Sequence, residues 1–94
     1  MRLRGRVDNN QPEIVKFLRK MGVSVLSLAP MGDGCPDLLV GINGKNYLFE
    51  IKKTKKSKLT KSEKIFQTNW KGQVQVVCNP ESIFYLINKK IKGG

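Results

Sequence analysis

The chain has 94 residues, with 18 Lys and Arg against 7 Asp and Glu, a formal charge of +11 at pH 7, and it contains no His. At this length we expect a single domain over 1–94 with a thin core, to whose stability a partner or a second copy would add. The absence of His excludes Ser-His-Asp and Cys-His triads, a His general base and a zinc site built on imidazole. Carboxylates, lysines, hydroxyls and a hard metal ion remain for catalysis.

The large positive charge indicates a polyanionic partner. It favours salt-dependent binding to phosphate backbones, although a ribosomal or nucleoid-type binding protein would carry a similar charge. A membrane is not expected as a partner, because no basic stretch also has a large apolar face and no apolar run is long enough to span a bilayer. Since no secretory signal is visible, Cys35 and Cys78 are expected to be inert, reduced thiols of a cytoplasmic protein.

The first third of the chain predicts a basic arm, a helix, a strand and a loop. Residues 1–10 are polar and basic, and Pro12 suits the first turn of a helix that ends at Gly22. A strand is expected over 23–29, followed by a loop over 30–36 that is rich in Gly and Pro. The apolar stripe of the helix consists of Ile14, Phe17, Leu18 and Met21.

The next stretch predicts a β-hairpin. Asn43 and Gly44 are a strong signal for a two-residue turn, which pairs Ile42 with Lys45 and fixes the register of both strands. In this register the apolar face consists of Leu38, Val40, Ile42, Tyr47, Phe49 and Ile51. The opposite face consists of Asp37, Leu39, Leu48, Glu50 and Lys52.

The second half predicts a basic loop, a helix, a strand and a last helix. Seven lysines lie within 52–64, and the first part of that stretch reads as a solvated loop. Helices are expected over 60–70 and from 79 to about 90, with a strand over 74–78 between them and a frayed tail over 92–94. The side chains expected to be buried are Leu59, Phe66, Trp70, Ile83, Phe84, Leu86 and Ile87. The order of elements predicts an α/β fold, a mixed β-sheet flanked by helices.

Two acidic residues meet on the second face of the hairpin. The register places Asp37 directly opposite Glu50, roughly 5 Å apart at Cβ, where like charges are destabilising. A divalent cation would relieve the repulsion, and Mg²⁺ binds one or two carboxylates together with water and phosphate oxygens. Lys52 projects from the same face as Glu50, within reach of an attacking water or a phosphate oxygen. With the basic charge, these residues indicate metal-dependent hydrolysis of phosphodiester bonds.

The same residues carry a family resemblance over about 11–87. The chain resembles the PD-(D/E)xK nuclease superfamily in two segments, Gly34-Cys35-Pro36-Asp37 and, at the end of the next strand, Glu50-Ile51-Lys52. It also resembles the virus-type replication–repair nuclease (VRR-NUC) branch of that superfamily. The features that carry this second resemblance are Leu59-Thr60, Phe66, Trp70 and a Val-rich strand after Gly72.

The resemblance implies a minimal restriction-endonuclease-like core and Mg²⁺- or Mn²⁺-dependent cleavage of DNA. It implies that Asp37 and Glu50 are metal ligands together with the backbone carbonyl of Ile51, and that Lys52 is the catalytic lysine. Glu13 would be a supporting acid that acts through water. In this family, small viral members resemble homodimeric enzymes that cut four-way junctions, and larger relatives cut flaps. The resemblance thus also implies a viral (phage) origin, a location in the host-cell cytoplasm and a role in DNA repair.

Three acids also have ordinary structural interpretations. Glu13 suits the first turn of a helix because of the helix dipole, but it lies at the edge of the apolar stripe beside Phe17 and could point into a cleft. Glu63 completes a capping box with Thr60, and it is equally a candidate for the site, where the family commonly has Gln. Asp33, between two glycines, is expected to be a turn residue.

The other basic residues are expected to contact phosphates as point charges. The candidates are Lys53, Lys55, Lys56, Lys58 and Lys61. We therefore expect a structure-selective, metal-dependent DNA endonuclease that resolves four-way (Holliday) junctions as a homodimer, because two symmetric cuts need two sites. The alternatives are a flap, nicked-duplex or RNA nuclease of the same fold, a non-catalytic nucleic-acid-binding protein, or a piece of a larger replication protein.

Overall fold

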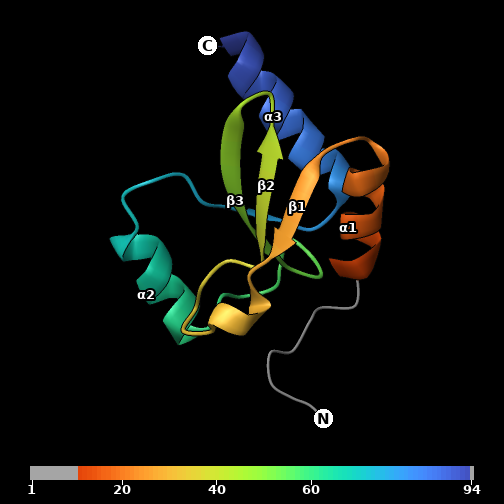
Figure 1. Cartoon of the computed structure of the whole chain (residues 1–94). Helices are drawn as coiled ribbons and strands as arrows, with labels where there is room; N and C mark the ends of the chain where they lie inside the picture. The colour runs from red at the N-terminus through yellow and green to blue at the C-terminus, as the bar shows by residue number, and fades with distance from the viewer. Residues whose placement is uncertain (1–10, 94) are drawn as a thin grey trace.

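A mixed four-stranded sheet organises residues 11–93, the part of the chain that the computed structural model describes (Figure 1). The strands lie in chain order, with β1, β2 and β3 antiparallel and β4 parallel to β3. They are β1 (Ser24–Ser27), β2 (Leu38–Ile42), β3 (Lys45–Ile51) and β4 (Gln75–Val77). The helices are α1 (Gln11–Lys20), the short 3₁₀ helix η1 (Ala29–Met31), α2 (Lys61–Asn69) and α3 (Pro80–Gly93). This arrangement confirms the expected α/β fold.

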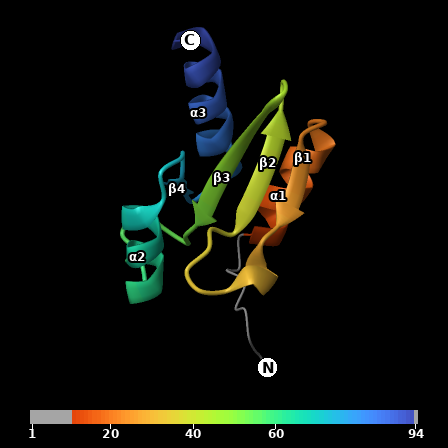
Figure 2. The ribbon, with the colours of Figure 1, turned by 60° about the vertical axis from the view of Figure 1, so that its left-hand side comes forward.

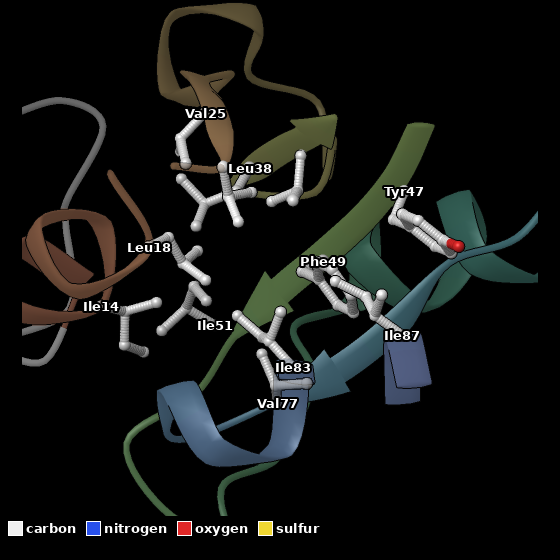
Figure 3. Close-up of a cluster of buried hydrophobic side chains, with 12 residues drawn as sticks. Ile14, Leu18, Val25, Leu38, Tyr47, Phe49, Ile51, Val77, Ile83 and Ile87 are labelled. Carbon is white, nitrogen blue, oxygen red and sulfur yellow. The ribbon is translucent and has the colours of Figure 1, made fainter. Parts of the chain in front are cut away.

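The helices α1 and α3 cover one face of the sheet, and both lie behind it in Figure 2. Between them and the sheet lies the hydrophobic core, where Ile14 and Leu18 of α1 approach Ile83 of α3 and Ile51 of β3 (Figure 3). Each of these four side chains is at most 1% exposed. Full burial of an aliphatic side chain of this size stabilises the fold by about 1.5–3 kcal/mol. Helix α2 stands beside the sheet and leaves its second face uncovered (Figures 1 and 2).

The β2–β3 hairpin has the register that its turn predicts. Ile42 pairs with Lys45, and Leu38 pairs with Phe49. Asn43 (φ 54°) is in the left-handed region, as is the glycine that follows it (φ 76°), and two-residue hairpin turns require this conformation. The predicted apolar face is confirmed, because all of its residues lie in the core or pack against it.

Three apolar side chains expected on the inner sides of their helices are exposed. Phe17 and Met21 are 37% and 59% exposed, because α1 buries the narrower stripe of Ile14 and Leu18. Trp70 is 46% exposed, since α2 does not pack on the core. The last helix extends past its expected end near residue 90 to Gly93, and the fraying of 92–94 stays a prediction. The predicted basic arm, residues 1–10, lies outside the described residues.

Element boundaries otherwise differ from the expectations by a few residues. The first strand ends at Ser27, and the chain then turns into η1 instead of continuing as a strand to residue 29. Within residues 11–93, none of the helices combines the length and the apolar character that crossing a membrane requires.

Candidate active site

The end of the hairpin brings Asp37 and Glu50 together. Asp37 directly precedes β2, and Glu50 is the penultimate residue of β3. The backbone N–H of Ile51 donates to Asp37 Oδ2 at 2.7 Å, and the backbone N–H of Leu28 donates to the Asp37 carbonyl at 2.7 Å. These bonds fix Asp37 against β3 and against the short segment between β1 and η1. Glu50 is only 2% exposed, although it lies on the sheet face away from the core.

The Glu50 carboxyl is held in a neutral state when no cation is present. Burial, and then the charge of Asp37 and a hydrogen bond with it, raise the pKa of Glu50 from 4.5 to about 9. Two carboxyl groups can share a hydrogen bond only if one of them is protonated. The second oxygen of Glu50, Oε1, is buried without a hydrogen-bond partner. The charge of Lys52 lowers the pKa of Glu50 but does not outweigh these effects, so the pair is a set of buried oxygens whose negative charge is only partly offset.

These oxygens fit a hard divalent cation. Oxygen ligands are what Mg²⁺ and Mn²⁺ take, and a cation would satisfy the buried Oε1 of Glu50 and replace the shared proton. Within residues 11–93, no three Asp, Glu, Cys or His side chains are grouped closely enough to hold a metal ion. The remaining coordination positions of a cation would thus belong to water, a backbone carbonyl or a DNA phosphate, which Mg²⁺ sites commonly use.

Lys52 extends from the end of β3 between two acids. Its Nζ donates to Glu63 Oε1 at 2.8 Å and lies 3.9 Å from Glu50 Oε2. The side chain of Lys52 is only 12% exposed, so these contacts are partly shielded from water. The Lys52 ammonium is therefore adjacent to the Asp37–Glu50 pair, but its short hydrogen bond is to Glu63.

Glu63 has both of the roles that its sequence context leaves open. It completes the capping box of α2, since Thr60 N donates to Glu63 Oε1 at 2.8 Å and Glu63 N donates to Thr60 Oγ1 at 3.2 Å. The same carboxylate accepts from Lys52. Burial alone would raise the pKa of Glu63, but the hydrogen bonds from Lys52 and Thr60 hold it below its usual value. Glu63 is therefore an anion that caps a helix and contacts the site.

The loop before Asp37 is fitted against the start of α2. Gly34 has φ +77°, and a Cβ at this position would overlap the backbone carbonyl of Ser62. Only glycine allows both this conformation and this close approach. Asp33, beside it, has φ 54° and is exposed, in agreement with the expected turn residue. The loop thereby connects Asp37 to the helix that carries Glu63.

Cys35 and Cys78 are not joined by a disulfide. Burial, followed by the charges of Glu50 and Asp37, raises the pKa of Cys35 above 9.0. This thiol stays protonated at neutral pH, where a nucleophile or metal ligand would need the thiolate. The result agrees with the expectation that Cys35 is unreactive.

The segment from residue 53 to residue 59 is an ordered basic loop. Thr54 and Ser57 close a turn inside it, with Ser57 N donating to Thr54 O at 3.1 Å and Thr54 N donating to Ser57 Oγ at 3.1 Å. The lysines of this segment and the first residue of α2 are exposed; they are Lys53, Lys55, Lys56, Lys58 and Lys61. They are a group of cations directly following Lys52 in the chain.

Glu13 is not brought into this cluster. It is exposed in the first turn of α1, and Phe17, the neighbour that would have pointed it into a cleft, is also exposed. The acids that act on the Glu50 carboxyl are Asp37 and Glu63. The role of Glu13 as a supporting acid therefore stays a prediction.

Sequence reasoning missed two features beside the site. The side chain of Gln73 accepts from Leu48 N at 2.7 Å and donates to Leu48 O at 2.8 Å, so it satisfies the edge of β3 where β4 does not reach. The second feature is an apolar groove of about 450 Å³ on the uncovered sheet face, bordered by Leu48 and by the stacked rings of Phe66 and Trp70. Alternation along the hairpin places Leu48 on this face, but no sequence signal indicates that α2 leaves it open.

Comparison with known families identifies the family of the chain. The family model for archaeal Holliday junction resolvase (Hjc) matches residues 3–75, more than three quarters of the chain, including Asp37, Glu50 and Lys52. No curated protein and no solved structure gives a significant match. The superfamily expectation is confirmed, whereas the VRR-NUC branch and the phage origin are not supported. The chain belongs to the Hjc family of PD-(D/E)xK nucleases, and it is a structure-selective, metal-dependent DNA endonuclease that resolves Holliday junctions.

Proposed function

We propose that Asp37 and Glu50 hold the divalent cation with which this resolvase hydrolyses DNA, and that Lys52 acts beside them. The observation that carries the proposal is Glu50, an acid that is 2% exposed, lies against a second acid and has one oxygen without a partner. Such a group is unfavourable in a protein that needs no cation. We expect Mg²⁺ to be the cation, with Mn²⁺ as a substitute and the Ile51 carbonyl as a further ligand.

The chain's own residues then have distinct tasks. A bound divalent cation supplies Lewis-acid stabilisation of the charge that develops on the phosphoryl group. Asp37 is oriented by its bond from the Ile51 N–H, so its ligand geometry is set before DNA arrives. As a ligand of that cation, Glu50 would be ionised, without the proton that it shares with Asp37 in the metal-free protein. Lys52 offers an ammonium that can stabilise a phosphate oxygen or orient the attacking water.

A cleavage assay tests this assignment. Labelled four-way junction, flap, nicked duplex and single strand are incubated with wild type, Asp37→Asn and Asp33→Asn, in Mg²⁺, Mn²⁺ or EDTA. Asp33 is the matched control, because it is an exposed acid in the same loop. We expect junction cleavage by wild type and Asp33→Asn in either metal, none in EDTA, and none by Asp37→Asn. Wild-type cleavage by Asp37→Asn would refute the metal site, and preferred cutting of another substrate would refute junction selectivity for this chain.

We propose that the basic loop 53–59 and Lys61 hold the DNA backbone. The support is an exposed group of lysines next to the acids, and phosphate contacts of this kind favour DNA shape over sequence. Each lysine that contacts a phosphate contributes about 0.9 to the slope of log affinity against log salt concentration. The double variant Lys55→Ala/Lys56→Ala should therefore lower that slope by roughly 1.8, measured by fluorescence anisotropy with junction DNA. An unchanged slope would remove this loop from the DNA interface.

We also propose that two copies of the chain pair through the apolar groove. The Hjc family binds Holliday junctions, typically as dimers, and two symmetric cuts need two sites. None of the residues lining the groove is charged, although the chain carries 18 cations. A surface without cations is unsuited to phosphate but suits a second copy of itself. Met31 and Trp70, which are 63% and 46% exposed, would be covered in such a dimer.

The mass in solution tests this pairing. Sedimentation or light scattering should give two chains for wild type and one chain for Trp70→Lys, because a buried charge at the interface has no partner. Tyr85→Lys is the control, since Tyr85 is 64% exposed on α3, away from the groove. It should remain a dimer. A wild-type mass of one chain, with and without junction DNA, would refute the dimer, and a dimeric Trp70→Lys would place its interface elsewhere.

A further inference from the structure

One oxygen of Glu63 joins the two ends of the basic loop. Glu63 Oε1 accepts from Lys52 Nζ at 2.8 Å and from Thr60 N at 2.8 Å. Lys52 directly precedes the loop 53–59, and Thr60 directly follows it. The Thr54–Ser57 turn shapes the loop in between. A single carboxylate oxygen thus holds both the lysine of the site and the start of α2.

Glu63 is itself held in place. The capping box fixes its backbone, because Glu63 N donates to Thr60 Oγ1 at 3.2 Å. The start of α2 is in turn packed against the loop that leads to Asp37, through the close approach of Gly34 to Ser62. The carboxylate is mostly buried, with a side chain that is 17% exposed. Glu63 is therefore an anchored acid, whereas Lys52 has a long side chain with several rotatable bonds.

The position of Lys52 depends on which acid it contacts. Its ammonium is 2.8 Å from Glu63 but 3.9 Å from Glu50. The negative charge of the Asp37–Glu50 pair, which shares one proton, would draw a released lysine onto the oxygens of the pair. There it would occupy the oxygens that we assign to the cation. Contact with Glu63 keeps the ammonium near the pair, 3.9 Å from Glu50 Oε2, and so leaves the carboxyl oxygens to the cation.

We infer that Glu63 is a positioning residue for the reaction: it holds the Lys52 ammonium beside the Asp37–Glu50 pair and fixes it relative to the basic loop that contacts DNA. The inference rests on the proposed role of Lys52. Removal of groups that orient a reacting residue commonly lowers activity or ligand affinity 10- to 100-fold. Glu63 makes this contact from α2, outside the hairpin that carries the other three residues.

The test compares three variants by single-turnover cleavage of junction DNA in Mg²⁺ and by junction affinity. Glu63→Ala should lower the cleavage rate roughly 10- to 100-fold with little change in affinity. Glu63→Gln keeps an oxygen that can accept from Lys52 and Thr60, so it should recover much of that loss. Thr60→Ala is the control for capping, because it removes the Oγ1 acceptor and weakens α2, while the backbone N–H of residue 60 still donates to Glu63 Oε1 and the Lys52–Glu63 contact is kept. It should lower thermal stability and keep the cleavage rate below its unfolding temperature.

A second measurement does not depend on activity. In ¹⁵N-labelled protein, the Lys52 Nζ resonance, identified by its loss in Lys52→Arg, should be protected from solvent exchange in wild type and Thr60→Ala and lose protection in Glu63→Ala. Equal rates for Glu63→Ala and Thr60→Ala, or an unchanged Lys52 resonance in Glu63→Ala, would overturn the inference. Wild-type cleavage by Lys52→Ala would instead refute the proposed function of the lysine, so the two failures are distinguishable.

Discussion

The substitution Glu50→Gln should remove most of the pH dependence of stability of the metal-free protein between pH 6 and pH 8. In the folded chain the pKa of Glu50 is raised to about 9, whereas the unfolded carboxyl titrates near 4.5. Across this window the folded state keeps a proton that the unfolded state has lost. Raising the pH therefore favours unfolding, and the wild type should lose stability as the pH rises. Gln has no proton to lose.

The size of the effect follows from the same values. Each pH unit within the window changes the free energy of unfolding by up to about 1.4 kcal/mol, which is about 2.7 kcal/mol from pH 6 to pH 8. Solvent screening beside an open sheet face reduces this to roughly half. The two other groups with shifted pKa values add little to this pH dependence. The pKa of Glu63 is lowered, so this acid is ionised in both states, and the pKa of Cys35 is raised from 9.0, above the window.

Urea denaturation at pH 6, 7 and 8 in EDTA measures this difference. The wild type should lose about 1–2 kcal/mol over the range relative to Glu50→Gln. Addition of Mg²⁺ at pH 8 should stabilise the wild type more than the variant, because the cation binds the ionised folded state. Parallel pH profiles of the two proteins in EDTA would refute the buried, protonated Glu50 on which the metal assignment depends.

Two further substitutions test, by urea denaturation, the contacts that hold the segments around the site together. Gly34→Ala should destabilise the fold by about 1–3 kcal/mol, because its Cβ would overlap the Ser62 carbonyl. Gly32→Ala is the control, since Gly32 also has a positive φ but a Cβ there would have nothing within 4 Å, so it should destabilise the fold less. Equal losses of stability would show that backbone strain alone matters. Gln73→Ala should cost about 1–3 kcal/mol by removing both hydrogen bonds to Leu48, and a neutral result would mean that water replaces them.

The carboxylate pair could be predicted because hairpin physics fixes it locally. Asn43-Gly44 sets the turn, the turn sets the register, and strand alternation then puts Asp37 and Glu50 on one face. The capping box of Glu63 is equally local, since Thr60 lies three residues earlier. Each of these inferences needs only the chain within a few residues or one strand pair.

What the sequence did not predict depends on contacts between distant segments. Helical periodicity identifies an apolar side for α1 and α2, but it does not show what covers that side. Phe17 is exposed because the core between α1 and the sheet is filled by residues such as Ile14 and Ile83. Trp70 is exposed because α2 stands beside the sheet and borders its uncovered face. The ion pair between Lys52 and Glu63 likewise depends on how α2 docks, through the approach of another loop, and no spacing encodes that.

The most direct test of the central claim is the single-turnover rate of junction cleavage by Glu50→Gln beside wild type. Both proteins are used in Mg²⁺ at concentrations that saturate the DNA, so that binding does not limit the rate. We expect the wild type to cut the junction in paired, symmetric positions and Glu50→Gln to bind the junction at least as tightly while cutting at least about 100-fold more slowly. Cleavage by folded Glu50→Gln at the wild-type rate would contradict the proposed metal site.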